Sequence, residues 1–224
     1  KTATMNELLT RGIGHTDFRE SELGLIPTTW KIEPLENLCN KIGDGIHATP
    51  SYIDSSPIKF VNGNNLRAGK LRVDSSTKSI SRAEFEKFGI GLESGSILMS
   101  INGTIGNLAV YNGENVVFGK SVAYLEFKSP LKNAYFFYLL ASTVVQNHFE
   151  NELTGTTIKN LSLRAIRMTP VVVPPLAEQE KIAEILTSLD DQIEAVESKL
   201  VQLESLKKSL MGDLLTGRVR VSVD

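Results

Sequence analysis

The 224-residue sequence predicts an α+β fold, in which a mostly β domain with a few helices is followed by one long helix. Two patterns predict this class. Between residues 23 and 175, short apolar or β-branched runs alternate with glycine, asparagine, proline and serine, which is typical of strands joined by turns. From Ile182 onward, apolar residues recur at alternating steps of three and four, which indicates a helix that packs on another helix.

The first 22 residues are expected to be the end of a helix followed by a linker. Met5–Thr10 reads MNELLT and Met211–Thr216 reads MGDLLT, and a glycine follows each copy within two residues. An imperfect internal repeat indicates one structural unit that is used twice. The alternative is a chance similarity between two helix ends that both stop at a glycine.

The domain between residues 23 and 175 is expected to be built from short strands at 58–61, 96–101, 108–111, 116–118 and 122–127. Asn102-Gly103 and Asn112-Gly113 separate apolar runs, which is a strong hairpin signal. A short helix is expected at 82–87, and a longer one at 133–150, where apolar residues have helical spacing.

Pro170, Pro174 and Pro175 are expected to close this domain and to start a long helix over residues 176–217, with a tail at 218–224. At 1.5 Å per residue the helix is roughly 60 Å long, which is more than a domain of this size covers. Pairing with a second helix is therefore expected. The apolar seam that would pair consists of Ile182, Leu186, Leu189, Ile193, Val196, Leu200, Leu203, Leu210 and Leu214.

Composition narrows the class of protein. Hydrophobic residues make up 41% of the chain, but no apolar run is long enough to span a membrane, and no signal peptide is expected before the domain. The single Cys39 excludes an internal disulfide and fits a cytoplasmic location. The net charge is −2, yet residues 59–82 carry six basic residues and one acid. A local basic stretch is the electrostatic footprint of a polyanion site, although a solvated face has the same composition.

No segment of the sequence matches the catalytic and metal-binding motifs that it partly resembles. Gly113–Ser121 has five residues between its glycines, where a phosphate-binding loop has four. The segment Val173–Leu176 has a Pro-Pro pair without the flanking residues that an amino-methyltransferase motif requires. His15, His47, His148 and Cys39 do not have metal-ligand spacing. We therefore expect no catalytic residue, no metal site and no cofactor in this chain.

Three turn-rich loops have the residues of a binding surface: Gly43–Pro50, Ser100–Gly106 and Gly155–Ser162. Small residues allow a ligand to approach the backbone, and hydroxyl, amide and ammonium groups donate to phosphates. Asn102 and Asn160 are candidates for pairing with adenine, and Lys159 for reaching guanine. Ordinary turn chemistry is the alternative, with Asn102 serving as a left-handed turn residue. The full candidate set is His47, Thr49, Lys59, Asn64, Arg67, Lys70, Asn102, Thr104, Thr156, Thr157, Lys159 and Asn160.

Taken in order, six motifs carry a family resemblance. The sequence reads LGLIPTTW, GDGIHATP, SILMSINGTIG, GTTIKNLS, PPLAEQEKIAEIL and KKSLMGDLLTGRVRV, and it resembles the specificity subunit of type I restriction–modification enzymes over nearly its whole length. Members of that family typically hold two target-recognition domains, separated by two long antiparallel helices, and bind two methyltransferase subunits.

The resemblance implies that residues 23–175 form one target-recognition domain, residues 176–217 one spacer helix, and residues 1–22 the end of a preceding spacer. The chain would then be a half-subunit or the C-terminal half of a full subunit. Its implied partners are double-stranded DNA, methyltransferase subunits, a restriction subunit indirectly, and a second copy or a second recognition half through the long helix.

The function implied is to read one half of a bipartite DNA target, without catalysis. S-adenosylmethionine, ATP and magnesium are expected only in the partner subunits, which would flip and methylate an adenine. The alternatives are the reader of a fused restriction–methylation enzyme, a β-rich glycan binder on a coiled-coil stalk, and a structural oligomerisation protein. The target sequence and the half-site spacing do not follow from the residues, because the bases read depend on loop conformation and DNA shape.

Overall fold

The computed structural model describes residues 1–155 and 159–216, in two compact units that divide between Ala183 and Glu184. The first unit combines mixed sheets with helices, and the long helix α7 (Leu176–Leu215) begins in it and continues through the second unit. The predicted α+β class with a long C-terminal helix is confirmed. The first unit also includes residues 1–22 and the first two turns of α7, whereas the sequence divided the chain at residues 23 and 176.

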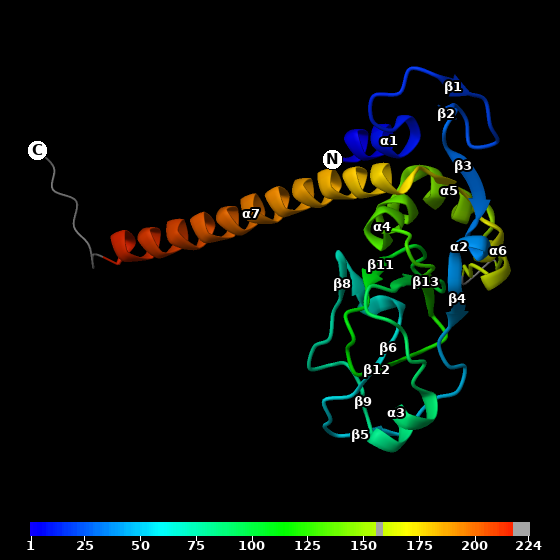
Figure 1. The fold of residues 1–224 in the computed structure, drawn as a ribbon. Helices are drawn as coiled ribbons and strands as arrows, with labels where there is room; N and C mark the ends of the chain where they lie inside the picture. Colours follow the sequence, from blue (N-terminus) through cyan, green and yellow to red (C-terminus); the bar gives the residue numbers. More distant parts are fainter. Residues whose placement is uncertain (156–158, 217–224) are drawn as a thin grey trace, which may run out of the picture. The chain divides into compact units, whose positions relative to one another are not determined.

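Two sheets form the body of the first unit (Figure 1). Among the described residues, the larger sheet has the strand order β4-β13-β10-β11-β8-β7, and the smaller has the order β12-β6-β9-β5. Neighbours are antiparallel except for β11 with β8 and β12 with β6. The strands are β4 (Cys39–Asp44), β5 (Tyr52–Ile53), β6 (Lys59–Val61), β7 (Leu66–Arg67), β8 (Gly69–Leu71), β9 (Ser79–Ile80), β10 (Ile97–Ser100), β11 (Leu108–Val110), β12 (Val116–Phe118) and β13 (Val122–Phe127).

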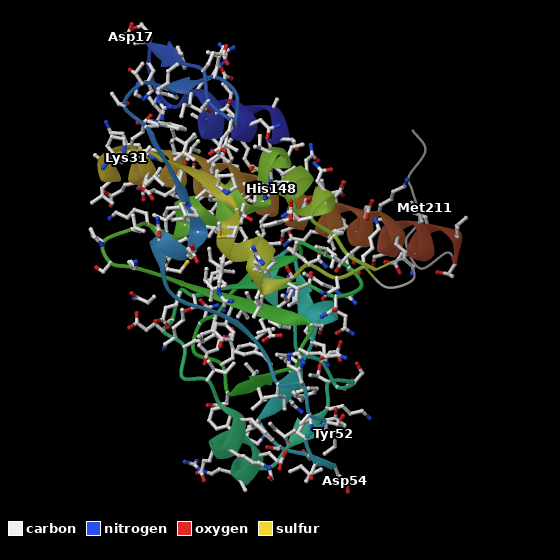
Figure 2. The ribbon with its side chains drawn as sticks, turned by 90° about the vertical axis from the view of Figure 1, so that its right-hand side faces the viewer. Asp17, Lys31, Tyr52, Asp54, His148 and Met211 are labelled. Carbon is white, nitrogen blue, oxygen red and sulfur yellow. The ribbon has the colours of Figure 1, made fainter. Side chains whose placement is uncertain are left out.

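Two smaller strand pairs and several short elements complete the first unit. β1 (Phe18–Arg19) pairs with β2 (Ile26–Pro27), and β3 (Lys31–Pro34) pairs with β14 (Pro170–Val173). Figure 2 shows Tyr52, the first residue of β5, and Asp54, which follows β5, at the opposite end of the unit from Asp17. The remaining elements are α1 (Thr2–Arg11), α2 (Leu35–Leu38), the 3-10 turn η1 (Gly63–Asn65), α3 (Arg82–Phe88), α4 (Asn133–Ala141), α5 (Thr143–Asn151) and α6 (Leu163–Met168).

The Asn-Gly turns have different outcomes. Asn102-Gly103 lies between β10 and β11, which pair antiparallel as predicted, although the connection is longer than a two-residue turn. Asn112-Gly113 lies between β11 and β12, which belong to different sheets, so the hairpin predicted there is wrong. The flanking apolar runs are buried in both cases, and burial alone does not say which strand becomes the neighbour.

The helix expected over residues 133–150 is broken at Ser142. This residue has extended backbone angles, φ −69° and ψ 151°, and its hydroxyl accepts a hydrogen bond from the backbone N–H of Val145. Serine is a preferred first cap of a helix because its side chain satisfies a free N–H group. The apolar spacing therefore continues through two helices, α4 and α5, that meet at a cap.

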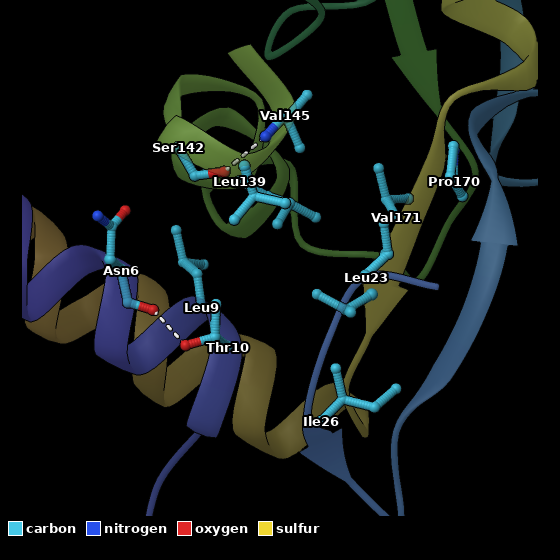
Figure 3. A pocket seen from close by; sticks show the side chains of 12 residues that line it. Asn6, Leu9, Thr10, Leu23, Ile26, Leu139, Ser142, Val145, Pro170 and Val171 are labelled. Atoms are coloured by element: carbon cyan, nitrogen blue, oxygen red, sulfur yellow. Dashed lines mark hydrogen bonds between the residues drawn. The ribbon is translucent and has the colours of Figure 1, made fainter. Parts of the chain in front are cut away.

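The N-terminal segment packs on the same unit. Met5 and Leu9 of α1 are buried, and Gly12 ends the helix with a φ of 67°. Leu9, Ile26, Leu139 and Val171 surround a space between α1, α4 and β14 (Figure 3). That space measures about 20 Å³, which is room for about one water molecule. It is a packing gap in the core and is too small for a ligand.

The long helix α7 changes character along its length. Ile182 and Leu186 are fully buried in the single chain, so these two predicted seam residues are already covered without a partner. Leu189 is half-buried, and the later seam residues are exposed, from 39% for Ile193 to 69% for Val196. Leu200, Leu203, Leu210 and Leu214 lie between these values. Across the described residues, no helix has both the length and the apolar character needed to cross a membrane.

Candidate functional site

The three loops singled out in the sequence meet at one open hollow of about 280 Å³. His47 comes from the loop after β4, Asn102 from the loop after β10, and Asn160 from the segment before α6. Their sequence separation is large, so only the fold brings them together. The full lining is Asp44, His47, Ile101, Asn102, Lys120, Asn160, Leu161, Ser162 and Leu163.

Backbone hydrogen bonds hold two of the three loops, those of Asn102 and Asn160, to each other. The Leu161 N–H donates to the Ile101 carbonyl at 3.0 Å, and the Gly103 N–H donates to the Lys159 carbonyl at 3.2 Å. Asn102 and Asn160 form an antiparallel bridge. These bonds extend the sheet edge past β10, so the side chains of Asn102 and Asn160 stand on a support that is more rigid than a free loop.

The loop after β4 is anchored to the turn between β12 and β13. The Gly45 N–H donates to the Val122 carbonyl at 3.0 Å, and the Ile46 N–H donates to the Phe118 carbonyl at 2.8 Å. A Cβ atom on Gly45 would lie 2.1 Å from the Phe118 carbonyl oxygen. The sequence suggested that small residues here admit a ligand. At Gly45 the structure shows instead that the glycine admits the backbone of its own chain.

Asn102 is not the left-handed turn residue that the alternative explanation required. In the part of the chain that the structure describes, Ala68 is the one non-glycine residue with a positive φ, so Asn102 does not occupy the left-handed region. Gly103 takes that conformation with a φ of 75°. The Asn102 Nδ2 donates to the Lys120 carbonyl at 3.1 Å, which directs the amide across the hollow toward the β12–β13 turn.

The hollow contains both signs of charge. The His47 Nε2 donates to the Asp44 Oδ2 at 2.8 Å, with the imidazole 72% exposed and the carboxylate 22% exposed. Lys120, which also lines the hollow, is exposed. Burial raises the pKa of the neighbouring Tyr124 hydroxyl, and the Asp44 carboxylate raises it further. The site therefore has a cation, amides and one carboxylate, which is a composition for hydrogen-bonding a polar ligand.

Other candidates lie around the hollow or away from it. Lys159, Thr49 and Thr104 are exposed on the three loops themselves. Asn64 is exposed in η1, where the Gly63 N–H donates to the Ser121 hydroxyl at 2.9 Å, next to Lys120. Thr156 and Thr157 lie outside the described residues.

The basic candidates of the strands form a separate group. Arg67 and Lys70 face each other on the β7–β8 pair, and the Arg67 Nε donates to the Asn64 carbonyl. Lys59 is half-buried in β6 and donates to the Ser79 hydroxyl at 2.9 Å. Lys59 lies on β6 of the smaller sheet and is not part of the lining of the hollow.

Asp44, Lys120 and Ser162 line the hollow but were absent from the sequence candidates. Lys120 belongs to the Gly113–Ser121 segment, which failed as a phosphate-binding loop, and Asp44 belongs to the Gly43–Pro50 loop, from which only His47 and Thr49 were candidates. Only the pairing of β4 with β13, which sets Asp44 opposite Ala123, places this carboxylate at the hollow.

Metal-ligating side chains are scattered over the described residues, and the single cysteine is buried. Within residues 1–155 and 159–216, no group of three or more His, Cys, Asp or Glu side chains is arranged to hold a metal ion. Cys39 is buried, and burial raises the pKa of its thiol to about 12, which disfavours the nucleophilic thiolate.

Comparison with known proteins gives a consistent result. A family model described as the type I restriction modification DNA specificity domain matches residues 27–205. The chain is 28% identical to the type I restriction enzyme MjaVIII specificity subunit of Methanocaldococcus jannaschii, over 99% of this chain and 54% of that protein. It is 29% identical to the putative MjaX specificity subunit of the same organism, over 99% of this chain and 51% of that protein.

Solved structures have the same fold. The HsdS subunit from Thermoanaerobacter tengcongensis matches with a TM-score of 0.60 at 16% sequence identity, over 95% of this chain and 48% of that chain. The S subunit from M. genitalium matches with a TM-score of 0.58 at 20% identity, over 82% of this chain and 45% of that chain. The chain thus spans about half the length of the relatives that it matches.

Proposed function

Because the chain belongs to the type I restriction–modification DNA specificity family, we propose that it is a DNA-recognition element that reads one half of a bipartite target. The observation that carries the proposal is the meeting of three distant loops at one polar hollow, with Asn102, Asn160 and His47 in its lining. Amide and imidazole groups on a firm support are suited to reading base edges, whereas lysines next to them are suited to phosphates.

We propose that the chain itself performs no chemistry. Its role would be to select the DNA and to dock methyltransferase subunits, which would bind S-adenosylmethionine and methylate the selected site. A restriction subunit would use the same recognition indirectly. The thiol of Cys39 and the lack of a metal-ligand cluster in the described ranges are compatible with this division of labour.

We further propose that residues 193–215 of α7 pair with a second long helix, from another copy or from a second recognition half. The exposed apolar side chains on these turns support the proposal. Burying one such side chain fully against a partner helix contributes about 1.5–3 kcal/mol, which a lone helix does not gain. The pair would set the distance between two half-sites.

The test is sequencing of the methylated DNA in source cells with and without this gene. We expect one methylated bipartite motif to disappear when the gene is deleted and to return when it is restored. An unchanged methylation pattern would remove the proposed function. A pattern that is lost only together with catalytic residues on the same polypeptide would favour the fused restriction–methylation enzyme.

The reading residues are tested in the same assay. Asn102→Ala and Asn160→Ala should each relax the motif at one base position, since a good bidentate contact discriminates by about 1–3 kcal/mol. Thr143→Ala, at an exposed position at the start of α5, is the control and should leave the motif unchanged. Identical motifs in all three variants would mean that these asparagines do not read bases.

A further inference from the structure

Asp44 is the unexpected member of the hollow. It ends β4, so its backbone is fixed by the pairing of that strand with β13. Its carboxylate lines the hollow and is 22% exposed, which leaves it accessible to a bound molecule. A surface that binds DNA for affinity alone gains nothing from a carboxylate, because phosphates repel it.

The Asp44–His47 pair is not needed to hold the loop. The backbone bonds from Gly45 to Val122 and from Ile46 to Phe118 already fix the chain on both sides of the turn. The His47 Nε2 donates a hydrogen bond to the Asp44 Oδ2 at 2.8 Å. The hydrogen bond from His47 therefore restrains the orientation of the carboxylate at the hollow.

A carboxylate accepts hydrogen bonds and cannot donate them, so it needs a donor on the ligand. In the major groove, the donors on base edges are the exocyclic amino groups, N4 of cytosine and N6 of adenine. Guanine presents only acceptors there, and thymine presents an acceptor and a methyl group. Lys120, on another side of the lining, offsets part of the repulsion between Asp44 and the phosphates.

We propose that Asp44 is a specificity-determining residue that selects a base with an amino group in the major groove, cytosine or adenine, at one position of the half-site, and that His47 is its positioning residue. The inference deepens the proposed function and rests on it. A position read in this way excludes guanine and thymine, since each would leave the carboxylate desolvated without a donor.

The first test uses the unmodified protein. The methylated motif identifies the half-site, and each of its cytosines and adenines is then replaced, one at a time, by the nucleoside that lacks only the amino group: 2-pyrimidinone for cytosine and unsubstituted purine for adenine. Binding is measured with the complete specificity protein and its methyltransferase subunits. We expect the replacement opposite Asp44 to weaken binding by roughly 5- to 150-fold, as should the replacement of any adenine that Asn102 or Asn160 contacts, and the second test identifies which of these positions belongs to Asp44.

The second test links that position to Asp44. Asp44→Ala should bind the natural and the amino-free duplex equally at that position and keep the preferences of the wild type at all others. Asp54→Ala is the matched control, because it removes a carboxylate of the same type at an exposed position beside β5 (Figure 2) and should discriminate as the wild type does. Asp44→Asn keeps the shape of the side chain, so it serves if Asp44→Ala does not fold; its neutral amide should give a smaller ratio between the two duplexes. His47→Ala should reduce the same ratio and no other.

The outcomes separate the inference from the proposed function. If deletion of the gene changes no methylated motif, the proposed function fails and the inference fails with it. If the motif depends on the gene but Asp44→Ala still discriminates against the amino-free duplex as the wild type does, only the inference fails. A uniform loss of affinity for all duplexes in Asp44→Ala and Asp44→Asn also overturns it, since that is the result of a structural role.

Discussion

At the scale of single residues, Glu178 joins three parts of the chain that are distant in sequence. Its Oε1 accepts from the Ile13 N–H at 3.0 Å and from His15 at 2.7 Å, and its Oε2 accepts from the Trp30 indole at 2.9 Å. The carboxylate is only 13% exposed. Glu178 lies in the first turn of α7, a favourable place for a carboxylate, but its three partners follow only from tertiary packing.

Glu178→Gln is expected to lower the free energy of unfolding by about 1–3 kcal/mol, because the amide presents an N–H group to one of three donors and loses the charge that strengthens the bonds. Urea unfolding measures the change. Glu180→Gln is the control: Glu180 pairs with Lys132 at 3.0 Å but is 55% exposed, so the change should be below about 1 kcal/mol. Equal losses in the two variants would contradict this account.

Cys39 predicts a pH dependence. Burial raises its pKa from an ordinary value of 9.0 to about 12, with an opposing effect of Lys128 and a small further rise from Glu126. The unfolded thiol ionises first as the pH rises, so the stability that the neutral thiol contributes is complete below about pH 9 and is lost progressively between pH 9 and 12.

Urea midpoints at pH 8 and pH 10 test this sign. The wild type should lose more stability between the two pH values than Cys39→Ala does, and the comparison cancels the buried tyrosines that both proteins contain. The thiol should also react with iodoacetamide far more slowly in the folded protein than in urea. An equal pH response in the two proteins would show that Cys39 titrates as an exposed thiol does.

The candidate site was predictable at residues whose type alone indicates binding. His47, Asn102 and Asn160 were proposed from three turn-rich loops, and the structure brings them to one hollow. Asp44 and Lys120 were not proposed, because their position depends on strand pairing across more than seventy residues of sequence, which local patterns do not encode. Lys59 was proposed for its charge, and in the structure its ammonium donates a hydrogen bond to the Ser79 hydroxyl.

At the scale of elements, periodicity identified five strands between residues 58 and 127 and the long helix, with ends within two residues of those observed, and it missed the other strands, the six-residue β4 (Cys39–Asp44) among them. The runs expected as strands at 116–118 and 122–127 are β12 and β13. The short strands at residues 26–27, 31–34 and 170–173 were missed, since two to four residues are too few to show alternation, and Pro170 argued against a strand. The break at Ser142 was also missed. A helix cap depends on residues within one turn, whereas apolar periodicity is read over several turns and continues across the break.

The long helix α7 exposes many of its apolar side chains to solvent. Leu200 is 55% exposed and Ile193 is 39% exposed, on the part of α7 that carries the heptad pattern. Ile193→Asp together with Leu200→Asp should dissociate the assembly to monomers and leave the β-rich unit folded, as judged by sedimentation and near-ultraviolet circular dichroism. Ser198→Asp, an exposed position between them that is not part of the seam, should leave the assembly intact. A well-folded wild-type monomer at micromolar concentration would rule out pairing.

At the scale of the whole molecule, charge is divided unevenly along the chain. The net charge is −2, but residues 176–224 have six basic and ten acidic residues, a balance of −4, and residues 1–175 have eighteen and sixteen, a balance of +2. A protein of this composition does not attract DNA through its overall field. Affinity must therefore arise from the local cations of the first unit, of which Lys120 and Lys159 belong to or flank the hollow.

The dependence of DNA affinity on salt tests that assignment. Each lysine that contacts a phosphate releases counterions, so Lys120→Ala and Lys159→Ala should each reduce the slope of log affinity against log salt by about one unit. Lys199→Ala removes the same charge from an exposed position on α7 and should leave the slope unchanged, because the acidic helix is not expected to contact phosphates. Binding of the complete protein to its duplex at several salt concentrations supplies the slopes. A slope that falls equally for Lys120→Ala and Lys199→Ala would mean that the cation effect is a property of net charge, and the phosphate contacts would then have to be sought outside the hollow.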